Sequence, residues 1–132
     1  MNTFNNLGLS KPLTNVLESL GFNKPTPVQE KAIPILLNDT PIDFIGLAQT
    51  GTGKTAAFGL PLIDIIERDN TSVQALVLAP TRELVQQTAK QLAQFARVVK
   101  GVNVEVVFGG AAITPQINSL KKPTQIVIAT PG

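Results

Sequence analysis

The stretch that decides the fold lies at residues 48–55 of the 132-residue chain and reads Ala48-Gln49-Thr50-Gly51-Thr52-Gly53-Lys54-Thr55. The apolar run at 44–48 predicts a buried strand, and the residues after the stretch predict a helix over 54–67. A glycine-bearing turn between a strand and a helix points backbone N–H groups and the helix N-terminus at one place, where they stabilise a polyphosphate. We therefore predict a phosphate-binding loop in an α/β protein.

The side chains of this loop suit a nucleotide. Gly51 and Gly53 avoid Cβ clashes where the backbone must wrap closely around an anion. Lys54 is placed to reach the β- and γ-phosphates, and the hydroxyl of Thr55 to coordinate Mg²⁺. The pattern G-x-x-x-x-G-K-[ST] is met except at its first position, which is Ala48. A glycine-rich turn without a ligand is the alternative, and the predicted strand and helix on either side count against it.

Outward from the loop, short apolar runs alternate with helical patterns. We predict further strands over 73–79, 104–108 and 126–130 and further helices over 13–20, 27–37 and 81–99. Near-continuous apolar strands are typical of a parallel sheet that is covered on both faces. The regular alternation therefore predicts a three-layer α/β fold, with a mostly parallel, doubly wound sheet and helices on both sides.

The predicted helices carry start and packing signals. Thr26 and Thr81 are expected N-caps, and Pro27 occupies a first helical position. Pro61 is expected to bend the helix after the loop. Residues expected to face the core are Leu13, Val16, Leu17, Leu20, Phe58, Leu84, Val85, Thr88, Leu92 and Phe95. Glu83, in a first helical turn, is expected to have a structural role only.

The composition limits the class of protein. Hydrophobic residues make up 43% of the chain and charged residues 15%, which is typical of a globular domain and not of a disordered one. Cys and His are absent, so disulfides and the usual zinc ligands are excluded. No secretory signal and no apolar run of membrane-spanning length is present, and we expect a cytoplasmic protein. The net charge of +2 permits nucleic-acid binding without arguing for it.

A second group of residues lies upstream of the loop, at 21–29. The amide of Gln29 can donate and accept, so it can pair with the N6 and N7 edge of adenine. The ring of Phe4 can stack on a purine. A turn followed by an ordinary exposed glutamine explains the same residues, and spacing alone favours that interpretation.

Five segments together resemble the N-terminal RecA-like domain of DEAD-box ATP-dependent RNA helicases. They correspond to the Q motif, motif I, motif Ia, the GG motif and motif Ib of that family, and here they are 21–29, 48–55, 80–84, 109–110 and 130–132. Each later motif is weak alone, but five in register are specific. The resemblance extends from Phe4 to Gly132.

This resemblance implies a role for each matching residue. In the family the glutamine of the Q motif recognises adenine, which assigns that role to Gln29 and overturns the interpretation as an ordinary exposed residue. The implied ATP-binding residues are Phe4, as the stacking aromatic, Phe22, Lys24, Gln29, Gln49, Thr50, Gly51, Thr52, Gly53, Lys54, Thr55 and Ala56. Lys54 and Thr55 would be catalytic, with Thr55 on Mg²⁺. The implied contacts to the RNA backbone are Pro80, Thr81, Arg82, Gly109, Gly110, Thr130 and Gly132.

General chemistry agrees with the RNA contacts. They follow predicted strand ends, where open α/β sheets bind ligands. Arg82 supplies a charged fork for a phosphate, and glycines let a phosphodiester approach closely. Such contacts do not read bases, so we expect salt-sensitive RNA binding with little sequence specificity. We expect a monomer with a Q-motif and helical region at 1–38 and the first part of helicase domain 1 at 39–132.

Some parts of the family pattern do not occur in the sequence. A phosphate-loop ATPase needs an acidic residue to hold Mg²⁺ and position the attacking water. No adjacent acidic pair follows a predicted strand here, and the Asp-Glu-Ala-Asp box and a second RecA-like domain are missing. We therefore expect an incomplete domain, a piece of a longer enzyme that binds nucleotide but scarcely hydrolyses it.

Two other interpretations remain open. A DNA helicase or another phosphate-loop NTPase would carry the same loop, although the Q-motif segment and residues 80–84 count against it. A non-catalytic module that holds ATP or RNA is the second. The RNA substrate, the pathway and any protein partner are not apparent from the sequence.

Overall fold

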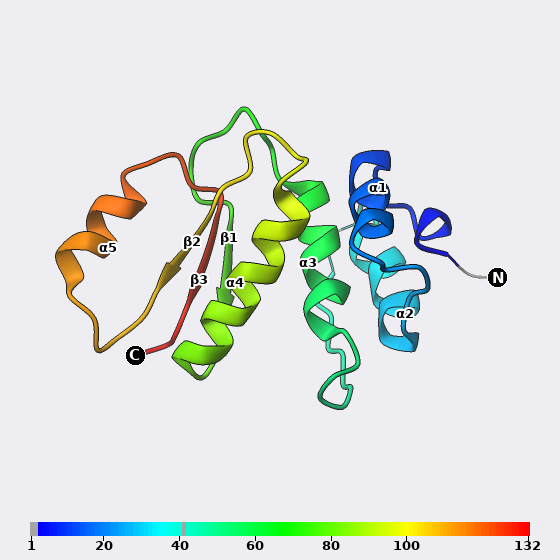
Figure 1. Cartoon of the computed structure of the whole chain (residues 1–132), viewed down its shortest axis with the longest axis horizontal. Coiled ribbons are helices and arrows are strands. Elements are labelled where there is room, and N and C mark those ends of the chain that lie inside the picture. Colours follow the sequence, from blue (N-terminus) through cyan, green and yellow to red (C-terminus); the bar gives the residue numbers. More distant parts are fainter. Residues whose placement is uncertain (1–2, 41) are drawn as a thin grey trace. The chain divides into compact units, whose positions relative to one another are not determined.

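The computed structural model describes residues 3–40 and 42–132. Its contacts group into two compact units, one that ends at Ile65 and one that begins at Ile66. The first unit is helical and carries the phosphate loop, and the second carries the sheet (Figure 1).

The first unit contains a 3₁₀ turn and three α-helices. They are η1 (Phe4–Asn6), α1 (Lys11–Ser19), α2 (Pro27–Leu36) and α3 (Lys54–Ile65). α2 packs against α3, and their fully buried residues include Ile33 and Leu60. The Ser10 N–H ahead of α1 donates to the Asp64 carboxylate of α3, with a donor–acceptor distance of 2.7 Å. Thr26 caps α2 as predicted, and α3 continues through Pro61.

The second unit is a parallel α/β arrangement. Its elements are β1 (Ala75–Leu78), α4 (Arg82–Ala96), β2 (Val104–Val107), α5 (Ile113–Leu120) and β3 (Ile126–Ala129). The strand order is β1-β3-β2, and all pairs are parallel. α4 packs on β2 and β3, and all four residues of β3 are buried. The α/β class and the parallel sheet predicted from the sequence are therefore confirmed.

The strand predicted over 44–48 is wrong. This segment carries no regular secondary structure, and Ile45 and Leu47 are 87% and 92% exposed. A strand forms only when its backbone N–H and C=O groups pair with a neighbouring strand. Among the described residues, β1, β3 and β2 pair only with one another, so the apolar run at 44–48 has no strand beside it.

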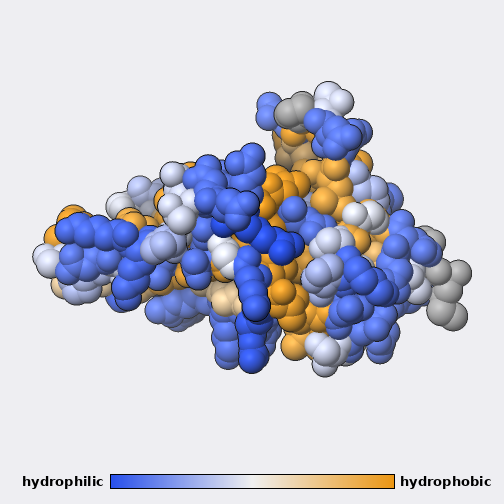
Figure 2. Space-filling model, turned by 90° about the horizontal axis from the view of Figure 1, so that it is seen from above, coloured by the Kyte–Doolittle hydropathy of each residue, from blue (hydrophilic) through white to orange (hydrophobic). Residues whose placement is uncertain are grey.

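Several side chains predicted to be buried reach the surface. Leu20, which directly follows the last residue of α1, is 39% exposed, Leu84 in the first turn of α4 is 40% exposed, and Phe58 is half-buried. Val85, Leu92 and Phe95 are fully buried, as predicted. Helix α5 was not predicted. Its apolar residues Ile113, Ile117 and Leu120 are exposed, and orange surface appears at the α5 end of the molecule, on the left of Figure 2.

The helices are short. The longest is α4, with 15 residues. In the ranges 3–40 and 42–132, no helix combines the length and apolarity that crossing a bilayer requires.

Candidate functional site

The loop before α3 has the backbone shape of an anion cradle. Gly51 and Gly53 both have φ near +81°, a conformation that side chains disfavour. α3 begins directly afterwards at Lys54, and the Gly53 carbonyl accepts from the Ala57 N–H at 3.1 Å. The first N–H groups of a helix have no acceptor within the helix, so those of Thr55 and Ala56 can donate to a ligand.

The polar side chains of the loop are held by the loop itself. The ammonium of Lys54 donates to the Ala48 carbonyl at 2.7 Å, and the Thr52 hydroxyl donates to the Gln49 carbonyl at 2.6 Å. A phosphate oxygen is a stronger acceptor for an ammonium than a neutral carbonyl is, so a nucleotide can take over the Lys54 contact. The loop therefore fits a polyphosphate.

Gln29 joins the Q-motif segment to this loop. Its side-chain Nε2 donates to the Gly53 carbonyl at 3.1 Å, and its Oε1 accepts from the Thr26 N–H at 2.9 Å. The Thr26 hydroxyl accepts from the Gln29 N–H, which completes a capping box at the start of α2. Gln29 is only 2% exposed, so the interpretation as an ordinary exposed glutamine is wrong.

The other residues predicted to contact the nucleotide differ in how exposed they are. Phe4 lies in η1 and is 4% exposed, so its ring would have to leave that packing to stack on a purine. Phe22 is half-buried and Lys24 exposed. Within the loop, Gln49, Thr50, Gly51 and Lys54 are exposed, Thr52, Gly53 and Thr55 are half-buried, and Ala56 is fully buried.

The residues around the phosphate loop offer few side-chain ligands for Mg²⁺. The described residues contain no group of three or more His, Cys, Asp or Glu side chains that could hold a metal. The hydroxyl of Thr55 is a side-chain oxygen in the first turn of α3, directly after the loop. It fits the usual mode of Mg²⁺ binding, in which the nucleotide phosphates and water supply most of the ligands.

In the second unit, the predicted RNA contacts gather at the carboxyl ends of the three strands. Leu78 and Val107 lie opposite Ala129 in the register, so the residues after them emerge at the same edge. The Gly109 N–H donates to the Thr130 hydroxyl at 3.4 Å. A Cβ on Gly109 would lie 4.0 Å from the backbone of Gly132. We call this group the strand-end edge: Pro80, Thr81, Arg82, Phe108, Gly109, Gly110, Thr130 and Gly132.

Arg82 and Phe108 contact one another at this edge. The guanidinium of Arg82 lies over the ring of Phe108, 4.4 Å from its centroid, which is a cation–π contact. A Cβ on Gly110 would come within 3.7 Å of the Arg82 Nη1, and Gly110 has φ near +81°. Thr81 caps α4, since its hydroxyl accepts from the Leu84 N–H at 3.1 Å, and its own O–H can still donate.

One residue that contacts the strand-end edge, Gln116 of α5, was not predicted from the sequence. The Gln116 side chain accepts from the Phe108 N–H at 2.9 Å and donates to the Phe108 carbonyl at 3.2 Å. The spacing of Ile113, Ile117 and Leu120 is the helical signal that could have located α5. No feature of the sequence marks Gln116 itself, because the contact depends on the path of the chain after β2.

A parallel α/β unit and a glycine loop at a helix N-terminus define the phosphate-loop class of nucleotide-binding proteins. Comparison with known proteins narrows the class. The DEAD/DEAH box helicase family matches residues 26–132. The ATP-dependent RNA helicase CshA of Limosilactobacillus reuteri is 48% identical over 129 residues, which are 98% of this chain and 25% of that protein. The chain belongs to the DEAD/DEAH box helicase family.

Solved structures agree with the family. The structure of a DEAD box protein from Methanococcus jannaschii matches 98% of this chain and 35% of its own, at 42% identity and a TM-score of 0.91. Dbp5 of S. cerevisiae, bound to RNA and ADP BeF3, matches 100% of this chain and 32% of its own, at 32% identity and a TM-score of 0.88. The predicted RecA-like fold is therefore confirmed. The chain spans about a fifth to a third of the length of these relatives.

Proposed function

We propose that the chain is the ATP- and RNA-binding N-terminal part of an ATP-dependent RNA helicase. In this proposal the loop at 49–56 holds the nucleotide phosphates, Thr55 contributes a ligand to Mg²⁺, and the strand-end edge contacts the RNA backbone. The relatives named as ATP-dependent RNA helicases support the activity. Hydrolysis of ATP coupled to separation of an RNA duplex is the activity of the longer enzyme.

The observation that carries the proposal is the hydrogen bonding of Gln29. A side-chain amide has two acceptor lone pairs and two N–H donors. Thr26 uses one lone pair, and the Gly53 carbonyl uses one donor. One acceptor and one donor are left, which is the complement of the adenine N6 and N7 edge. Because the same amide contacts Gly53, the base-reading group and the phosphate loop belong to one unit.

The strand-end edge supports the second half of the proposal. It combines one exposed arginine with glycines and a threonine hydroxyl, and these groups suit a phosphodiester backbone. Dbp5, which shares this fold, has been solved with RNA bound. The edge offers no set of long side chains for reading bases, so sequence-independent binding is expected.

A nucleotide panel tests the role of Gln29. We expect ATP to bind the chain about fivefold more tightly than GTP, because guanine keeps N7 but has the O6 acceptor where adenine has the N6 donor, so one hydrogen bond of roughly 1 kcal/mol is lost. Gln29→Ala removes both the acceptor for adenine N6 and the donor for N7, so it should abolish this preference. Isothermal titration calorimetry with both nucleotides gives the ratio. Equal affinities of the unmodified chain for ATP and GTP would contradict the adenine-reading role.

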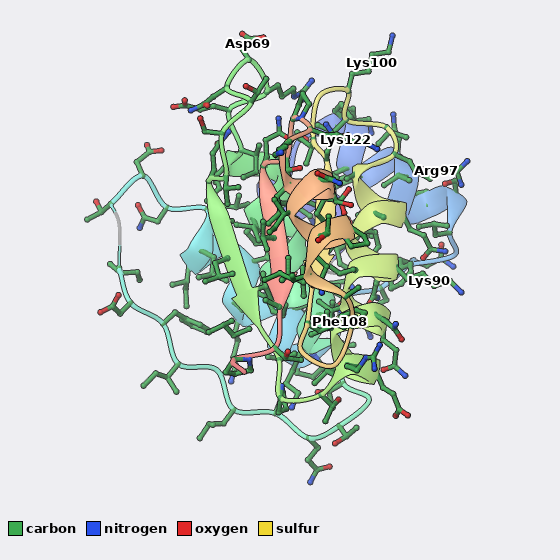
Figure 3. The ribbon with its side chains drawn as sticks, turned by 90° about the vertical axis from the view of Figure 1, so that its left-hand side faces the viewer. Asp69, Lys90, Arg97, Lys100, Phe108 and Lys122 are labelled. Atoms are coloured by element: carbon green, nitrogen blue, oxygen red, sulfur yellow. The ribbon has the colours of Figure 1, made fainter. Side chains whose placement is uncertain are left out.

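A salt series tests the strand-end edge. We expect Arg82→Gln to weaken binding of single-stranded oligouridylate and to lower the slope of log K against log salt by about 0.7, the value for one lost phosphate contact. Arg97→Gln is the matched control, because Arg97 is exposed at the opposite end of α4. Figure 3 labels Arg97 well away from Phe108. An equal change of slope in both variants would mean that net charge, and not this edge, determines binding.

Other expectations stay predictions. They are the monomeric state, the cytoplasmic location, the Mg²⁺ site at Thr55 and the division of the chain into 1–38 and 39–132. Analytical ultracentrifugation tests the first of them directly.

A further inference from the structure

The contact between Arg82 and Phe108 has a particular geometry. The guanidinium lies over the ring face, 4.4 Å from the centroid (Figure 3 labels Phe108). A guanidinium carries five N–H groups, more than one ring face can engage, so several of them remain available to acceptors. The Arg82 side chain is exposed, and these N–H groups therefore face solvent. The Phe108 ring therefore restricts the positions of the Arg82 side chain, and the N–H groups of Arg82 are still free to bind a ligand.

Phe108 is itself fixed through its backbone. β2 ends at Val107, so Phe108 lies one residue beyond the paired part of the strand. The Gln116 amide accepts from the Phe108 N–H and donates to the Phe108 carbonyl. It also donates to the Ala112 carbonyl at 3.1 Å. A primary amide presents a donor and an acceptor side by side, as a peptide group does, so Gln116 pairs with Phe108 in place of a neighbouring strand.

We propose that Phe108 and Gln116 are positioning residues that hold Arg82 ready for an RNA phosphate. The proposal rests on the proposed function, in which Arg82 contacts the RNA backbone. An exposed arginine samples many rotamers, and ordering it during binding opposes association. The ring reduces that freedom before RNA binds, and Gln116 keeps the ring in place. The neighbouring Gly109 and Gly110 leave the approach open to a phosphodiester.

The ring contact can be measured without RNA. A proton above an aromatic ring has its NMR resonance shifted by the ring current, so the Arg82 side-chain signals should be displaced in the unmodified chain. The Arg82→Gln variant assigns them by their loss. We expect Phe108→Leu to return them to ordinary arginine values and Phe108→Tyr to keep the displacement. Gln116→Leu should reduce it, whereas Asn118→Leu, an exposed amide on the same helix, should not.

Binding of oligouridylate then links the contact to function. We expect Phe108→Leu and Gln116→Leu each to weaken binding about two- to fivefold, as expected for an exposed cation–π contact. Both should lower the salt slope, because the Arg82–phosphate contact becomes less occupied. Phe108→Tyr should restore both values. In the Arg82→Gln background, Phe108→Leu should have no further effect, since the residue that it positions is gone.

The outcomes separate the two proposals. If Arg82→Gln leaves RNA binding unchanged, the proposed function of this edge is wrong and the positioning role is wrong with it. If Arg82→Gln weakens binding but Phe108→Leu adds its full effect in that background, only the positioning role is wrong. A lower affinity with an unchanged salt slope would also overturn it, since a loss of folded protein lowers affinity without removing a phosphate contact. If Phe108→Leu does not fold, Gln116→Leu replaces it in the same two tests, the salt series and the double variant with Arg82→Gln.

Discussion

Replacement of Lys54 by alanine is expected to weaken ATP binding roughly 10- to 100-fold, because a charge-assisted hydrogen bond contributes about 1.5–3 kcal/mol. The ammonium already lies at the loop, 2.7 Å from the Ala48 carbonyl. It needs only to exchange that neutral acceptor for phosphate oxygens. Titration of the chain with ATP and with ADP measures the loss. The loss should be larger for ATP, because Lys54 is proposed to reach the γ-phosphate.

Lys31→Ala is the matched control for this variant. Lys31 is an exposed lysine on α2 in the same unit, so its loss changes the net charge by the same amount. We expect its effect on ATP affinity to be small, because surface charges away from a site are screened by salt. If both lysine variants lose affinity equally, the loop attracts nucleotide only through the overall charge of the unit.

Gly53→Ala is expected to destabilise the first unit by about 2–4 kcal/mol, and Gly51→Ala by about 1–2 kcal/mol. Both glycines have φ near +81°, so both substitutions strain the backbone. They differ in what a Cβ would meet. At Gly51 it meets nothing within 4 Å, whereas at Gly53 it collides with the amide of Gln29. The difference between the variants' free energies of unfolding therefore measures how much the contact of Gln29 with Gly53 stabilises the first unit.

Urea unfolding measures this difference. The chain contains neither Trp nor Tyr, so far-UV circular dichroism at the helix band is the suitable signal. The helices of the first unit should give most of the change in the circular dichroism signal when the glycine variants unfold. A double variant with Gln29→Ala gives a further control, because it removes the side chain that the Cβ strikes. Equal stability losses for Gly51→Ala and Gly53→Ala would contradict a specific Gln29 contact.

Much of the fold could be predicted from local patterns. The strands at 75–78, 104–107 and 126–129 are short, mostly apolar runs, each with a Pro or Gly two residues after its end, and turn residues mark such ends. The helix after the loop follows from the glycine turn, and Thr26 and Thr81 are N-caps because their hydroxyls accept from the helix N–H groups. These signals are local, so a single sequence contains them.

The failures have one physical origin. Whether 44–48 forms a strand depends on a neighbour that no local pattern describes. Leu84 has the right helical spacing, yet it lies in the first turn of α4 and is 40% exposed, and spacing does not describe the tertiary contacts that decide this. The contacts of Gln29 with Gly53 and of Gln116 with Phe108 join residues from different elements. The resemblance to a family predicts that Gln29 matters, and only the structure shows which backbone atoms it engages.

The unpaired segment before the loop has a consequence for how the loop is anchored. Residues 42–47 are exposed and carry no regular secondary structure. Proteases cleave where the backbone is extended and accessible, so this connection is the natural place for a cut in the first unit. On its other side the loop continues into α3 and touches Gln29 of α2. The loop therefore takes its order from α3, which follows it, and from Gln29 of α2, which packs against α3, so a break at 42–47 would leave its shape largely intact.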